Sequence, residues 1–456
     1  MTSTLRRPTA VRRPWSTPRL LRTARNGLLL LVTLLLIAVV QSTAMYRGAM
    51  NTVGRDAAPS IIAAQRIRTA ISGMDAELAN ELLSAPGTGL AALTNYDGQR
   101  NQAVISLVAA AENITYGETE RGPIHTLQNG LAVFEELAQQ TRDEHETNSP
   151  ATLETYHQAE SLVTRSLLPA AGDLDAANAS VLERSYRRAT VNDGFARGSV
   201  VLLGLVTVGG LLVIQFFLSQ RMRRTLNPML LAATLLIFWL TVHAVSAFGT
   251  AGEQRRVAKQ DAFDSVSTLG RARALAFEAE GEESHFLLDP ARAPAAQLAF
   301  TTDVNSLAHL PDGLTPDQLI AATRNGPPVD GFTGYLADEL RNITFPGERD
   351  AAIGALASFE DYSKLDGQVR ALERSGQHKE AVDLSVNTNP GGAAGAFRRF
   401  DTALGNALAI NQGAFEAAVL DSLRALRGLE VEALVASGVA GVLIFLGIGA
   451  RLKEYQ

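Results

Sequence analysis

The chain has no cysteine among its 456 residues, and this absence excludes several kinds of protein. Disulfide bridges, thiol catalysis and cysteine-ligated zinc all need the missing side chain. The sequence also lacks a Walker loop, a nucleophile elbow, an HExxH motif and a dinucleotide-binding fingerprint. We therefore expect a protein that is not an enzyme and that carries no metal or cofactor.

Charge is absent from four long apolar runs. The runs cover residues 27–45, 198–218, 229–247 and 433–450. A helix needs about 20 apolar residues to cross a bilayer, so each run is a candidate transmembrane helix. The middle two are joined by residues 219–228 alone, which predicts a helical hairpin. Glycines in the second and fourth runs permit close helix contact and favour a four-helix membrane bundle or a homodimer.

The distribution of charge predicts the orientation. Residues 1–26 hold seven arginines and no acid, and the hairpin turn holds Arg221, Arg223 and Arg224 and no acid. Basic residues beside membrane spans are retained in the cytoplasm. We therefore predict a cytoplasmic basic arm (1–26), turn (219–228) and tail (451–456), with residues 46–197 and 248–432 outside the cell membrane. These acidic outer segments argue against nucleic-acid binding.

The first apolar run has an alternative interpretation. A basic leader, an apolar run and Ser42-Thr43-Ala44 also resemble a signal peptide with a small-residue cleavage site. The leader is long for a signal peptide, and the second half of the chain begins with an internal run at 229–247 that could not be removed in this way.

Both outer segments have the apolar periodicity of helical bundles. Ile67, Ile71, Met74, Leu78 and Leu82 lie on one helix face, which predicts that the first span continues to about residue 85, where Pro86-Gly87 ends it. Further helices are expected over 89–111, 124–146 and from 149 towards the second span. In the second segment we expect helices over 251–288, 351–375, 379–386 and from about 394, with a broken stretch at 311–346.

Repeated short sequence motifs indicate an internal duplication. Asn113-Ile114-Thr115 recurs as Asn342-Ile343-Thr344, residues 131–135 (LAVFE) recur as 356–360 (LASFE), and Leu83 falls opposite Leu287. The spacing is 204 at the first helix, 229 at the first motif and 225 at the second. The expected fold is an all-α membrane protein with four transmembrane helices and two extracytoplasmic antiparallel helical bundles.

Residues 376–382 (GQHKEAV), followed by a final helix with Asn411, resemble the four-helix-bundle sensory domain of bacterial chemoreceptors. That resemblance implies an outer sensory bundle between two spans. The chain departs from the family because its cytoplasmic segments are too short for a signalling domain. The layout is similar to the actinobacterial four-span component between an amino-acid-binding lipoprotein and a cytosolic serine/threonine kinase. This similarity implies both as partners.

Several side chains are candidates for binding. Arg66 and Arg68 lie on the first outer helix, where a guanidinium could pair with a carboxylate ligand. Asn342 and Thr344 could join bundle motion to the spans or could simply hold a turn. Arg221, Arg223 and Arg224 would form the cytoplasmic signalling surface, and the broken stretch 311–346 is a candidate partner contact.

Two acidic patterns are expected to be solvated helix faces. Glu154 with His157, and Glu282 with His285, have the Glu-x-x-His spacing that di-iron bundles use, but no partnering glutamate pattern accompanies them. Glu278, Glu280, Glu282 and Glu283 form an acidic run that could take a cation or a basic partner, although a solvated face is the default.

The sequence as a whole favours a non-enzymatic transmembrane signal transducer. Its outer bundles would sense a ligand or a ligand-loaded binding protein. An accessory subunit of a transporter or envelope complex, and a direct small-molecule sensor, are the alternatives.

Overall fold

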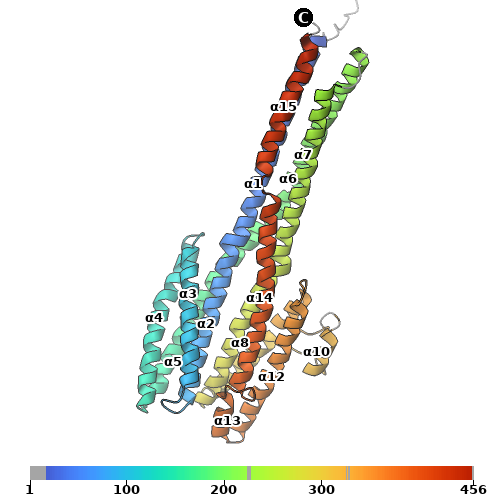
Figure 1. The fold of residues 1–456 in the computed structure, drawn as a ribbon. Helices are drawn as coiled ribbons and strands as arrows, with labels where there is room; N and C mark the ends of the chain where they lie inside the picture. Colours follow the sequence, from blue (N-terminus) through green and yellow to red (C-terminus); the bar gives the residue numbers. More distant parts are fainter. Residues whose placement is uncertain (1–16, 223–226, 325, 327–328, 454–456) are drawn as a thin grey trace, which may run out of the picture. The chain divides into compact units, whose positions relative to one another are not determined.

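The computed structural model describes residues 17–222, 227–324, 326 and 329–453, and Figure 1 shows how their helices are arranged within each part. The described residues contain one isolated antiparallel bridge, between His309 and Thr333, and otherwise only helices and turns. The all-α prediction is confirmed. Expectations that concern residues 1–16, Arg223, Arg224 or the last three residues lie outside the described residues.

Four helical stretches are long and apolar enough to cross a membrane. They run over Pro18–Leu83, Thr152–Gln220, Pro228–Leu288 and Ala393–Leu452, and each contains one of the expected runs. The chain therefore has the features of a multi-pass membrane protein. Each stretch is much longer than a bilayer requires, because it also includes helical residues of the bundles.

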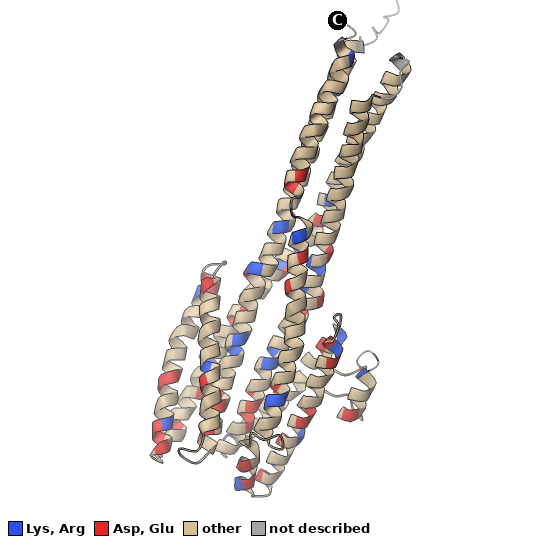
Figure 2. Cartoon of the chain, viewed as in Figure 1, with Lys and Arg blue, Asp and Glu red and all other residues tan. Residues whose placement is uncertain are grey.

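The chain divides into two compact units. The span unit comprises the described parts of residues 1–48, 188–253 and 422–456, and the bundle unit comprises residues 49–187 and the described parts of 254–421. Charged residues are sparse along the apolar helices of the span unit and frequent on the helices of the bundle unit (Figure 2).

The span unit packs four helices around one apolar core. They are α1 (Thr17–Asn51), α6 (Leu168–Met222), α7 (Pro228–Arg256) and α15 (Leu429–Lys453). Gly204 is required by close packing, since a Cβ there would lie 2.4 Å from the Thr241 side chain. His243 stacks on Trp239, and its Nε2 lies 2.9 Å from a carboxylate oxygen of Glu432.

The last helix is interrupted, contrary to the expectation of one helix from about residue 394 into the fourth span. Helix α14 (Ala393–Ala425) ends before α15 begins, and Gly428 between them has φ +82°. Arg47 compensates for the break, because it donates to the freed carbonyl of Leu426 at 2.8 Å and pairs with Glu430 at 2.8 Å.

The first repeat of the bundle unit is a four-helix bundle that agrees with the expected order. Its elements are η1 (Thr52–Ala57), α2 (Ala58–Leu83), α3 (Leu90–Glu112), α4 (Glu118–Glu146), α5 (Thr152–Leu162), η2 (Val163–Leu167) and the start of α6. Helix α4 begins six residues before the expected Ile124. Glu120 explains the earlier start, because its carboxylate accepts hydrogen bonds from the backbone amides of Thr115 and Tyr116, which precede the helix.

The second repeat has the same plan with a more broken middle. Its elements are η3 (Val257–Phe263), α8 (Asp264–Leu288), α9 (Ala293–Leu307), α10 (Pro316–Arg324), α11 (Tyr335–Arg341), α12 (Glu348–Arg374), α13 (His378–Ser385) and α14. Each repeat has its own apolar core, centred on residues such as Phe134 in the first and Phe359 in the second.

A π-helical turn lies in the first helix of each repeat, and a recurring asparagine binds to it. Asn113 donates to the Asp56 carbonyl and to Ser60, both at 2.8 Å. Asn342 donates to the Asp261 carbonyl at 3.1 Å and to Ser265 at 3.0 Å. π-turns leave carbonyl groups without their usual partner, and the asparagine amide supplies one.

These equivalent contacts agree with the predicted duplication and correct its register. Ser60 and Ser265 are 205 positions apart, and so are the helix caps Ser84 and Asp289. The spacing of 204 predicted from Leu83 and Leu287 is therefore one residue too short within the helix. Pro86 and Pro290 are 204 positions apart, because the loop that follows α8 reaches its proline one residue sooner than the loop that follows α2.

Candidate ligand-binding site between the two repeats

Helices α2 and α8 pack against each other along the middle of the bundle unit, and equivalent residues of the two repeats meet there. A Cβ on Gly270 would lie 2.2 Å from Gln65, and one on Gly281 would lie 3.7 Å from Ala76. Each pair is 205 positions apart. Contact between equivalent residues is what an approximate twofold axis between two helices produces, so the repeats form a pseudo-dimer within one chain. We call this contact the seam.

The seam is polar, although it is buried. Asp75, Glu77, Glu280 and Glu283 have between 3% and 8% of their surface exposed. Asn95 donates to Glu77 at 2.8 Å and Ser385 donates to Glu283 at 2.7 Å. One carboxyl oxygen on each of Asp75, Glu280 and Glu283 has no hydrogen-bond partner among the described residues.

Burial makes these glutamates weak acids. It raises the pKa of Glu77 to about 7 and that of Glu283 to about 8. Burial, reinforced by the charges of Glu77 and Glu283, raises the pKa of Glu280 well above its usual value. Protonated carboxyl groups cost far less to bury than carboxylates, which explains how several of them share one seam. The expectation that the acidic run is a solvated face is wrong for Glu280 and Glu283.

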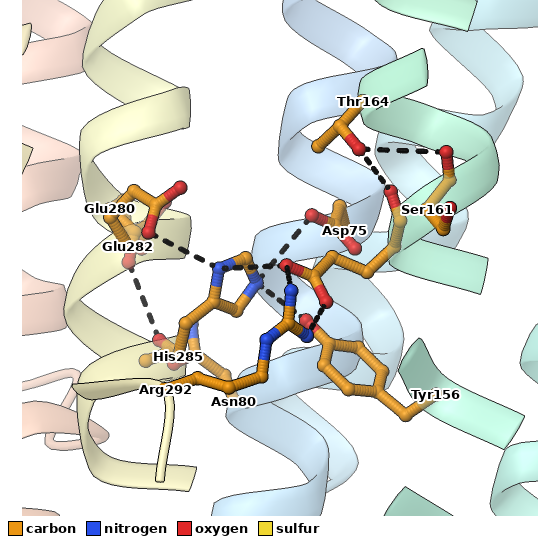
Figure 3. Close-up of polar contacts among 11 residues, drawn as sticks. Asp75, Asn80, Tyr156, Ser161, Thr164, Glu280, Glu282, His285 and Arg292 are labelled. Carbon is orange, nitrogen blue, oxygen red and sulfur yellow. Dashed lines mark hydrogen bonds and ion pairs between the residues drawn. The ribbon is translucent and has the colours of Figure 1, made fainter. Parts of the chain in front are cut away.

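His285 lies at the centre of a network on one side of the seam (Figure 3). Its Nε2 is 2.6 Å from the Tyr156 hydroxyl and 3.6 Å from Asp75, and its Nδ1 is 3.6 Å from Glu282. Burial acts to lower the pKa of His285, but Asp75 and Glu282 outweigh it and raise the pKa to about 10. The ring is therefore an imidazolium at neutral pH, and it donates to Tyr156.

The network closes around a small cavity of about 170 Å³. Arg292 pairs with Glu160 through two contacts, one of them 3.1 Å long, and His157 lies 3.2 Å from Asp289. Both histidines of the Glu-x-x-His motifs line this one cavity. The two Glu-x-x-His motifs were expected to lie on separate solvated helix faces. This expectation is wrong for His285, because its side chain is largely buried. The described residues hold no cluster of side chains suited to a metal ion.

The opposite side of the seam is an open groove, which we call the arginine groove. Its cavity of about 590 Å³ is lined by residues of α2, α3, α8 and α14. An adjoining cavity of about 460 Å³ shares Glu77, Asn95 and Arg398 with it. These volumes lie in the usual range for small-molecule sites, which is about 300–1,000 Å³.

Four arginines on the first helices flank the seam, and three of them have carboxylate partners. Arg68 makes two contacts with Glu278, at 2.7 and 3.0 Å. Arg271 pairs with Asp175 at 2.8 Å, and Arg273 pairs with Asp401. Arg66 differs: among the described residues its side chain contacts Gln412 at 3.5 Å and no carboxylate.

Residues 49–187 match the family of actinobacterial sensor domains. No curated protein and no solved structure shows significant similarity to the chain. The matched range coincides with the first segment of the bundle unit, and the second segment repeats its plan. The match supports a sensory domain in an actinobacterial protein, and with it a role in sensing or signalling.

The other residues singled out from the sequence lie in three places. Asn342 and Thr344 hold the turn next to η3, where Thr344 accompanies the asparagine by donating to its carbonyl. Arg221 belongs to α6, and Arg223 and Arg224 lie outside the described residues. The broken stretch 311–346 packs on the second sensor-like repeat through α10 and α11. Their roles in partner binding and signalling stay predictions.

Sequence reasoning missed Arg398, Glu77 and Arg292. None of them belongs to a local motif, since each meets its neighbours from a different helix of the bundle unit. The one available signal was the repeat itself, which pairs Glu77 with Glu282 at the corrected spacing.

Proposed function

We propose that the chain is a non-enzymatic transmembrane signal transducer. Its bundle unit receives a ligand or a ligand-loaded binding protein outside the cell membrane. Its termini and hairpin turn, with Arg221, Arg223 and Arg224, report to a cytosolic partner. A serine/threonine kinase is the expected class of that partner, in line with the similarity of the layout to the actinobacterial four-span component.

The observation that carries the proposal is helix continuity. An unbroken helical path runs from Pro18 to Leu83, and another from Pro228 to Leu288. Each path contains an apolar span, a π-turn and a seam helix. A change in the packing of α2 against α8 is therefore a displacement of helices that include the spans. Packed helices switch between discrete arrangements, which suits transmission of a signal.

Orientation is tested with single cysteines, since the natural chain has none. Glu146→Cys and Gln377→Cys lie in the two repeats, and Gln220→Cys lies at the hairpin. A membrane-impermeant maleimide applied to intact cells is expected to label the first two, and to label the third only after permeabilisation. Labelling of Gln220→Cys in intact cells, or protection of either repeat, would overturn the proposal.

Partners are tested by crosslinking the full chain in its native membrane and purifying it. Recovery of an extracytoplasmic solute-binding protein together with a serine/threonine kinase supports the proposal. Recovery of transporter subunits instead would favour the accessory role. A control purification with the bundle unit intact and the hairpin arginines replaced by glutamine is expected to lose the kinase and keep the binding protein.

A further inference from the structure

Two cavities lie on opposite sides of the seam, and their linings differ. One is the His285 cavity, between α5, α8 and α9, and the other is the arginine groove, between α2, α3, α8 and α14. Glu282 in the first and Glu77 in the second occupy equivalent positions, 205 apart. The equivalents of His285, Leu288 and Asp289, which are Asn80, Leu83 and Ser84, line the adjoining cavity of about 460 Å³ instead, so the two sites are neighbours across the seam that share one equivalent position.

The His285 cavity is occupied by the chain's own charges. Arg292 is paired with Glu160, His285 with Asp75 and Glu282, and His157 with Asp289. Every cationic group in its lining has an internal carboxylate partner, and only about 170 Å³ of space is left. An external anion would have to displace these partners.

The arginine groove has the opposite character. Arg66 and Arg398 both line it, and neither has a carboxylate partner among the described residues; Arg398 donates to the Thr388 carbonyl at 2.6 Å. Partial burial and the neighbouring charge of Arg273 lower the pKa of Arg66. Arg271, the equivalent of Arg66 in the other repeat, is by contrast neutralised by Asp175.

The rest of the groove is suited to a small polar molecule. Asn95, Gln99 and Gln102 of α3 line it with amide groups. Phe277 and Phe397 form an apolar wall, with their rings 4.9 Å apart in an edge-to-face contact. A guanidinium without a partner binds a carboxylate in a bidentate geometry, and side-chain amides hydrogen-bond the remaining polar groups of such a molecule.

We infer that the arginine groove binds one small organic dicarboxylate per chain, held by Arg66 and Arg398, and that the His285 cavity across the seam is closed to ligand by the chain's own carboxylates. Two guanidinium groups without a carboxylate partner among the described residues match a ligand with two carboxylates. This inference rests on the proposed function, because it names the class of ligand that the sensory unit receives.

The test uses the purified full chain in nanodiscs, with succinate as the probe and isothermal titration as the measurement. Succinate is expected to bind with a stoichiometry of one, and its neutral isostere succinamide is expected not to bind. Arg66→Ala and Arg398→Ala should each weaken succinate binding by at least about tenfold, the effect of losing one charge-assisted contact. Arg271→Ala is the matched control and should leave the affinity unchanged.

Three outcomes would overturn the inference: no heat with succinate, equal binding of succinamide, or tighter binding of inorganic phosphate than of succinate. Loss of binding in Arg271→Ala as well as in Arg66→Ala would also overturn it. Arg66→Gln, checked by its unchanged melting temperature without ligand, separates lost binding from lost folding. If succinate binds but the crosslinking experiment recovers no partner, the proposed function is contradicted and the inference is not. If the partners are recovered but succinate does not bind, the inference is contradicted and the proposed function is not.

Discussion

Ala76 and Gly281 face each other across the seam, with a Cβ on Gly281 falling 3.7 Å from that of Ala76. They are equivalent residues of the two repeats. Their contact means that the twofold arrangement, which separate sensory chains can reach only by dimerising, is built into a single polypeptide. Because the two repeats of one chain can differ in sequence, one repeat can form a ligand site while the other does not. Two identical chains have the same sequence and lack this possibility.

This contact predicts an internal disulfide. Cβ atoms about 3.5–4.5 Å apart can be bridged by cysteines, so the Ala76→Cys, Gly281→Cys double variant should crosslink within one chain on mild oxidation. The product is expected to run as a compact monomer on a non-reducing gel. Ala76→Cys with Gly270→Cys is the control, since those sites are separated by roughly 16 Å along the helix. Oxidation to a covalent dimer instead would contradict the internal seam.

The π-turn contacts predict a second effect, on stability. Asn113→Ala removes the amide that donates to Asp56 and Ser60, leaving a partly buried carbonyl without its partner. Such a loss costs about 1–3 kcal/mol. Asn342→Ala should cost a similar amount, and the two should add because they share no partner. Urea unfolding measures the loss of stability in each variant, with the exposed Asn101→Ala as the control. A loss equal within error to that of the control would contradict the role assigned to Asn113 and Asn342.

The order of helices could be predicted from the sequence, whereas the seam could not. Apolar runs and helix-ending prolines are local, and they placed the end of α2 at Ser84 within a residue or two. The burial of the acidic run near Glu280 could not be predicted from its neighbours in sequence, because the helix that covers it is α2, about two hundred residues earlier. Arg398 had no signal for the same reason. The displaced start of α4 followed from one side chain, Glu120, whose hydrogen bonds no periodicity records.

The His285 network predicts a large penalty for removing its cation. His285→Ala would leave Asp75 and Glu282, each 3.6 Å from a ring nitrogen, without their cationic partner. Breaking a buried ion pair on one side costs about 3–5 kcal/mol. Tyr156→Phe should cost less, about 1 kcal/mol, because it removes a single hydrogen bond. Urea unfolding against the exposed His125→Ala tests the ranking, and equal costs for the three variants would refute it.

The seam glutamates predict that the bundle unit is less stable in alkali. The folded pKa of Glu283, about 8, exceeds the ordinary value of 4.5, so the folded state holds a proton that the unfolded state releases. Stability is therefore complete at low pH and falls as pH rises from about 4.5 to 8. His285, with a pKa of about 10, extends the fall from about 6.5 to 10, because its proton is also held more tightly in the folded state.

Glu283→Gln should remove part of this dependence. It keeps an acceptor for Ser385 and has no charge to bury, so its melting temperature at pH 8.5 should exceed that of the natural chain by about 2–4 °C for each kcal/mol gained. At pH 5, where Glu283 is protonated, the two should melt together. For Glu112→Gln, on the exposed face of α3, the difference in melting temperature from the natural chain should not change between pH 5 and pH 8.5. A difference that is constant between pH 5 and pH 8.5 would mean that Glu283 carries its charge in the folded seam.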